Sequence, residues 1–84
     1  MAQFWLGNSE YAQKDYKSAI TTLQTMVKHY PLHGRVPDAL LTLANSQIEA
    51  GQKPAAKKTL ENLIAKHSDT EAADLAKQAL KRLK

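Results

Sequence analysis

The sequence feature that most constrains the fold is an internal repeat within the 84 residues. Adding 37 to a residue number, which we call the 37-residue frame, superposes a first copy on a second with seven identical residues: Ala2 on Ala39, Leu6 on Leu43, Asn8 on Asn45, Ser9 on Ser46, Ala19 on Ala56, Thr22 on Thr59 and Leu23 on Leu60. In repeat proteins each copy is a small unit that cannot bury its apolar face alone. The sequence therefore predicts similar units stacked on one another.

Each unit is predicted to be two helices joined by a turn. Apolar residues recur every three or four positions between Tyr16 and Tyr30, which is the period of one helix face, and Pro31 prevents the helix from continuing. The same reasoning predicts five helices: Ala2 to Gln13, Tyr16 to Tyr30, about Val36 to Gly51, one from about Pro54, and a last one announced by a capping box of Ser68 and Glu71.

The turns and one close helix contact can also be predicted. Lys14 and Gly51 occupy equivalent turn positions that favour a left-handed backbone, and Asp15 is suited to cap the helix that follows Lys14. Gly7 lies inside a predicted helix, where glycine costs about 1 kcal/mol relative to alanine. We therefore expect another helix to approach closely at Gly7.

The repeated unit resembles the tetratricopeptide repeat, a helix-turn-helix motif of about 34 residues. The residues that carry this resemblance are Leu6-Gly7, Ala19, Leu23 and Pro31, and the longer period fits an enlarged link at Leu32-His33-Gly34. It implies one all-α domain over residues 1–84, an α-α superhelix. Repeat 1 covers about 2–34, repeat 2 about 35–68, and a capping helix about 69–83.

The N-terminal edge of this stack is predicted to be uncovered. The repeat pattern already includes Ala2, and no capping residue precedes it. Solenoids usually need three or more repeats to be stable. We therefore expect that a preceding repeat has been removed. Trp5 at such an edge would mediate self-association, which sedimentation of a Trp5→Ala variant tests.

Composition argues against several functional classes. The chain has no cysteine and no apolar run of the roughly 18 residues that span a membrane. His29 and His33 are separated by Pro31, which breaks the helix that would align them, so no metal site is predicted. The sequence shows no catalytic arrangement and no cofactor motif either. The chain is therefore expected not to be an enzyme. The net charge of +4 gathers only at the end, at Lys77, Lys81, Arg82 and Lys84, where a solvated helix terminus explains it better than nucleic acid does.

The candidate binding surface is a concave groove formed by the first helix of each repeat. Residues three, four and seven apart share a helix face, which gives Phe4, Asn8, Tyr11 and Ala12 in the first repeat and Leu41, Asn45, Ile48 and Glu49 in the second. The amides of Asn8 and Asn45 both donate and accept hydrogen bonds and so suit a peptide backbone. Two alternatives stay open: the asparagines cap turns, or Phe4 and Tyr11 are core residues or contacts to the missing preceding repeat.

A closer resemblance is to the C-terminal repeat domain of the YbgF/CpoB family of Tol-Pal system proteins. It rests on Phe4-Trp5-Leu6-Gly7-Asn8, Asp15-Tyr16, Ala19-Ile20, Tyr30-Pro31, Pro37-Asp38-Ala39-Leu40-Leu41 and Leu43-Ala44. It implies a periplasmic module that binds TolA and a class A penicillin-binding protein, and that coordinates peptidoglycan synthesis with outer-membrane constriction in cell division. An outer-membrane assembly lipoprotein shares much of the pattern, so a scaffold in assembly or secretion is the alternative, and a basic nucleic-acid binder a weaker one.

Overall fold

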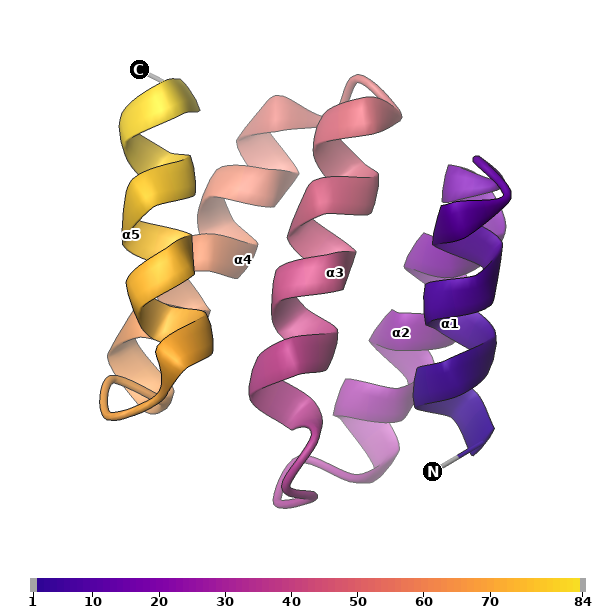
Figure 1. The fold of residues 1–84 in the computed structure, drawn as a ribbon, viewed down its shortest axis with the longest axis horizontal. Helices are drawn as coiled ribbons and strands as arrows, with labels where there is room; N and C mark the ends of the chain where they lie inside the picture. The colour runs from indigo at the N-terminus through magenta and orange to yellow at the C-terminus, as the bar shows by residue number, and fades with distance from the viewer. Residues whose placement is uncertain (1, 84) are drawn as a thin grey trace.

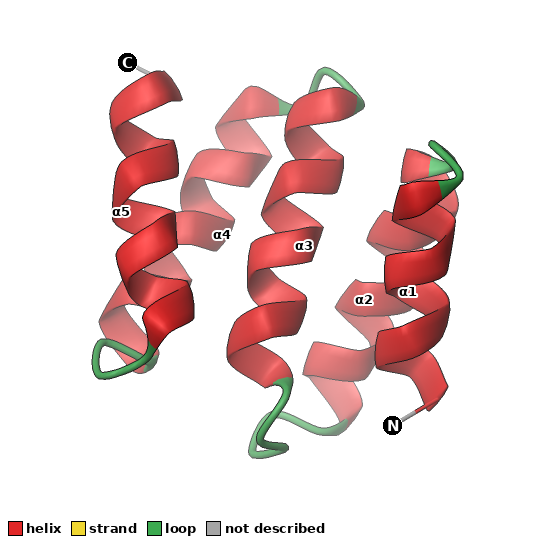
Figure 2. Ribbon diagram, viewed as in Figure 1, coloured by secondary structure: helices red, strands yellow, loops and turns green. Residues whose placement is uncertain are grey.

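A computed structural model describes residues 2–83, and this part of the chain forms five helices (Figure 1). They are α1 (Ala2–Ala12), α2 (Tyr16–His29), α3 (Val36–Glu49), α4 (Lys53–Lys66) and α5 (Glu71–Leu83). Figure 2 shows helices and short loops only, and residues 2–83 contain no strand. The predicted all-α class is therefore confirmed.

The helices lie in two layers. In Figure 1, α1, α3 and α5 stand side by side in front, while α2 and α4 stand behind them. Each helix packs against the next along the chain, and α3 also packs against α1 and α5. Two helix pairs, α1 with α2 and α3 with α4, are thus followed by α5, as expected for a stack of helix-turn-helix units.

Local interactions explain where the second helix of each pair begins. Lys14 has a φ of 65° and Gly51 a φ of 81°, so both turns use the left-handed backbone that the sequence predicted. The Asp15 carboxylate accepts a hydrogen bond from the Ser18 amide at 3.4 Å, which confirms Asp15 as the cap of α2. The start of α3, the first helix of the second pair, is also explained locally. Pro37 lies in its first turn, where the missing amide hydrogen breaks no helical hydrogen bond.

The core lies between the two layers. Its largest fully buried side chains are Leu23, Met26, Val36, Leu60 and Leu63. Gly7 faces Leu23, because a Cβ atom built on Gly7 would lie 2.5 Å from Leu23 Cδ2. This confirms the close approach of α1 and α2 at Gly7. The hydroxyl of Thr59 in α4 also donates a 2.7 Å hydrogen bond to Oε1 of the buried Gln47 in α3.

The start of α5 corrects one prediction. Ser68 does not cap this helix, because Oγ1 of Thr70 accepts the hydrogen bond from the Ala73 amide at 3.2 Å. The Thr70 hydroxyl also donates to the carbonyl of His67 at 2.6 Å, so one side chain joins the end of α4 to the start of α5. The predicted capping box of Ser68 and Glu71 is therefore wrong, because the capping residue is Thr70, two residues after Ser68.

The ends of the stack are more exposed than its middle. Leu6 is 52% exposed, whereas its equivalent in the 37-residue frame, Leu43, is 5% exposed. Trp5 is 58% exposed on the same outer helix, and self-association through it stays a prediction. Tyr30, predicted as the last residue of the helix, is half exposed at the cap position beyond the end of α2. Lys84, expected in the basic cluster, lies outside the described residues.

Candidate functional site

The candidate site is the front face, which we define as the surface of α1, α3 and α5 that carries Asn8, Asn45 and Arg82. These three residues occupy one position of the 37-residue frame, since 8 and 45 differ by 37, as do 45 and 82. They lie on the three helices that stand side by side in Figure 1. The 37-residue frame therefore predicts a row of two amides and one guanidinium group, of which Asn45 and Arg82 line one hollow.

The front face is hollowed between α3 and α5. The hollow has a volume of about 200 Å³ and is lined by Leu41, Asn45, Leu75, Gln78, Ala79 and Arg82. Leu41 and Asn45 are half-buried, whereas Leu75 is 43% exposed. Apolar side chains thus lie beside three polar groups that can donate hydrogen bonds, which is the usual composition of a recognition site.

Sequence reasoning missed the contribution of α5 to this hollow. It treated α5 as a cap with a cationic face, although the repeat continues into this helix: Ala39 maps onto Ala76 and Leu43 onto Leu80. Applying the 37-residue frame a second time places Gln78 beside Leu41 and Arg82 beside Asn45. The signal that would have found both residues was present in the sequence.

On the other side of α3, the structure brings Tyr11 and Glu49 together. Burial raises the pKa of Tyr11 above its ordinary value of 10.0, and the charges of Glu49 and Tyr16 raise it further. The Tyr11 and Tyr16 rings pack edge to face with centroids 5.6 Å apart. Tyr11 is therefore half-buried, and its hydroxyl stays protonated at neutral pH because its pKa is raised.

The raised pKa of Tyr11 predicts a loss of stability at alkaline pH. Because the pKa is higher in the folded chain than in the unfolded one, the stabilisation is complete below about pH 10 and disappears as the pH rises through the folded-state value. Spectrophotometric titration of the wild type and Tyr11→Phe would identify the Tyr11 transition. Glu49→Gln is expected to move the pKa of Tyr11 toward 10.0 without removing the whole shift, since burial is the larger cause. A Tyr11 transition below 10.0 in the folded protein would contradict this.

Phe4 does not offer an accessible apolar surface. Its ring is 6% exposed and belongs to the core. The guanidinium carbon of Arg35, the residue before α3, lies 5.7 Å from the Phe4 ring centroid and 5.8 Å from that of the exposed Trp5. For Phe4 the structure thus matches the core alternative that the sequence left open.

The remaining candidate residues differ in accessibility. Asn8 and Ile48 are half-buried, whereas Ala12 and Glu49 are exposed. In the described part of the chain, no group of three or more histidine, cysteine, aspartate or glutamate side chains could hold a metal ion. No helix among residues 2–83 is long and apolar enough to cross a membrane.

Comparison with known proteins agrees with this geometry. A family model described as tetratricopeptide repeat matches residues 10–80, from the end of α1 to the last turns of α5. No curated protein is significantly similar to the chain. Tetratricopeptide repeats are typically non-catalytic modules whose stacked helices form extended surfaces for protein partners.

Proposed function

Because the chain belongs to the tetratricopeptide repeat family, we propose that it is a protein-interaction module whose front face binds an extended peptide segment of a partner. The observation that carries the proposal is the hollow between α3 and α5, which Asn45 and Arg82 line, while Asn8 occupies the equivalent frame position on α1. Family membership alone supports an interaction role, and the row supports where the partner binds.

The chemistry of the row suits a peptide backbone. The side-chain amides of Asn8 and Asn45 make no hydrogen bond within the described residues, so both remain able to donate to a peptide carbonyl and accept from a peptide amide. Leu41 and Leu75 offer apolar contact for a side chain of the same segment. Arg82 lies at the end of the row and would favour a peptide with a carboxylate at that point.

The YbgF/CpoB resemblance supports a narrower proposal. In it, the chain works in the periplasm as part of the Tol-Pal system, binds TolA and a class A penicillin-binding protein, and links peptidoglycan synthesis to outer-membrane constriction during division. The alternative is a scaffold in outer-membrane assembly or secretion, which uses the same surface for other proteins. The residues quoted for the resemblance are the support for this narrower role.

The test is affinity capture from periplasmic extract with the wild type and Asn8→Ala/Asn45→Ala. Removing two neutral hydrogen-bonding groups is expected to weaken binding of a partner about tenfold to thirtyfold. Gln24→Ala/Lys28→Ala is the matched control, because both residues are exposed on α2 behind the front face. TolA and the penicillin-binding protein are expected in the wild-type eluate, and their absence would remove the narrower proposal.

Two results would count against the proposal, the first against its site and the second against its kind of partner. Equal recovery of partners by the wild type and Asn8→Ala/Asn45→Ala would remove the amides from it. Preferential capture of nucleic acid, with an affinity that falls steeply as salt rises, would favour the nucleic-acid alternative instead.

A further inference from the structure

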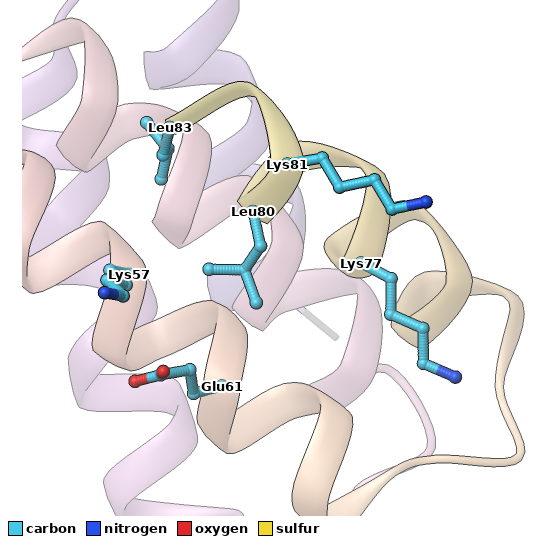
Figure 3. A pocket seen from close by; sticks show the side chains of 6 residues that line it. All are labelled: Lys57, Glu61, Lys77, Leu80, Lys81 and Leu83. Carbon is cyan, nitrogen blue, oxygen red and sulfur yellow. The ribbon is translucent and has the colours of Figure 1, made fainter.

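A second hollow lies on another side of the molecule, between α4 and α5 (Figure 3). Its volume is about 340 Å³, and it is lined by Lys57, Glu61, Lys77, Leu80, Lys81 and Leu83. We call it the α4–α5 groove. Leu80 and Leu83 extend from α5 into it, and Lys57 and Glu61 come from α4. The groove shares no residue with the hollow of the front face.

The internal repeat indicates what occupies the corresponding place elsewhere in the fold. On α3, Leu40, Ala44 and Gln47 are four and three residues apart and so share one helix face. The hydrogen bond from Thr59 to Gln47 shows that this face meets α4. Leu40, Ala44 and Gln47 are all buried. A helix therefore covers this face of α3.

The same face of α5 lies in the α4–α5 groove and has no such cover. In the 37-residue frame, Leu40 and Ala44 become Lys77 and Lys81, which are exposed. The neighbouring buried positions Leu43 and Ser46 become Leu80 and Leu83, which are only half-buried. Among residues 2–83, α5 packs only against α3 and α4, so no described helix does for α5 what α4 does for α3.

We propose that the α4–α5 groove binds an acidic amphipathic helix supplied by a partner protein. The occupant is a helix because α4, a helix, covers the equivalent face of α3. It must lie farther out than α4 does, because the long side chain of Lys81 occupies the frame position of Gly7, where α1 and α2 approach closely, and of the small, buried Ala44. At that distance its apolar residues meet Leu80 and Leu83, and its carboxylates meet the lysine ammonium groups.

The charge of the groove selects the partner. Three of the six lining residues are lysines and one is a glutamate. A second copy of this chain is a poor occupant, because its net charge is +4 and α4, the helix that covers the equivalent face of α3, carries four lysines and one glutamate. An acidic helix complements the groove both in shape and in charge. This inference goes beyond the front-face proposal, since a different surface and a helical ligand are involved.

The probe for the test is a labelled synthetic peptide of about 15 to 20 residues, long enough to form a helix on binding. Its apolar residues follow the spacing of Ala56, Leu60 and Leu63 in α4, and glutamates flank them. One control peptide replaces these glutamates by lysines, and another has the same composition in scrambled order. Fluorescence anisotropy would measure affinity for the whole 84-residue chain.

The glutamate peptide is expected to bind, and both control peptides are expected to bind much more weakly. Lys77→Glu/Lys81→Glu is expected to weaken binding about tenfold, since two attractive contacts become repulsive. Lys53→Glu/Lys58→Glu is the matched control, because it changes the net charge equally at exposed positions of α4 outside the groove. All four lysines are exposed, and circular dichroism would verify that the fold is retained.

Four outcomes would overturn the inference. They are no binding of the glutamate peptide, equal binding of the scrambled peptide, equal weakening by the two double variants, and amide chemical-shift changes that centre on Asn8 and Asn45 instead of Leu80 and Leu83. The last outcome would move the ligand to the front face. Failure of the Asn8→Ala/Asn45→Ala test would leave the α4–α5 groove untouched, so the two proposals can fail separately.

Discussion

Replacing Leu23 by alanine is expected to lower the free energy of unfolding by about 3 to 4 kcal/mol. Leu23 is fully buried in α2 and packs against α1 at Gly7, so the substitution leaves a cavity that both helices line. A chain of this length has a total stability of about 4 to 12 kcal/mol. The variant is therefore expected to lose at least about a quarter of its stability, so urea should unfold it at a clearly lower concentration, as measured by circular dichroism.

Leu32→Ala is the matched control, because Leu32 is 96% exposed in the link between α2 and α3. Its effect is expected to stay within about 0.5 kcal/mol. If the two leucine variants had the same unfolding midpoint and slope, Leu23 would not be the core residue described here.

Replacing Gly7 by alanine is expected to destabilise the protein by about 1 to 2 kcal/mol, although alanine favours helix by about 1 kcal/mol over glycine. The new Cβ atom would lie 2.5 Å from Cδ2 and 2.6 Å from Cγ of Leu23. Since Leu23 is fully buried, its side chain cannot swing into solvent, and α1 must move away from α2. Urea unfolding would measure the loss.

The same substitution in the Leu23→Ala background is expected to have the opposite sign. There the Gly7→Ala methyl group fills part of the cavity and the helix preference for alanine is no longer opposed. Gly34→Ala provides the control, because no atom lies within 4 Å of a Cβ built there. A destabilisation by Gly7→Ala that persisted in the absence of the Leu23 side chain would rule out their contact as its cause.

Much of the fold could be predicted because the helix-turn-helix pattern occurs twice in the sequence. The helix period around Leu23, the turn positions Lys14 and Gly51, and the cap at Asp15 are local properties that a residue and its near neighbours decide. The close approach at Gly7 could also be predicted, because a glycine inside a helix has little other reason to be there.

What could not be predicted depends on how elements pack or compete. Ser68 and Thr70 are both good capping residues, and the hydrogen bond of Thr70 to the His67 carbonyl favours the later start of α5. Phe4 has the spacing of a groove residue, but its ring is contacted by Arg35, which is more than thirty residues away in the sequence. In contrast, the position of Gln78 and Arg82 in the hollow was missed, although both are equivalent in the 37-residue frame to the groove residues Leu41 and Asn45.

The position of α3 has a consequence for how the protein opens. Within residues 2–83, α3 packs against all four other helices, whereas α1 and α2 have no contact with α4 or α5. Either end can therefore detach while the rest of the stack stays folded, and amide protons should exchange with solvent slowest in α3. Partners held on the front face and in the α4–α5 groove would both slow this opening at the C-terminal end, and each would thereby make the other easier to bind.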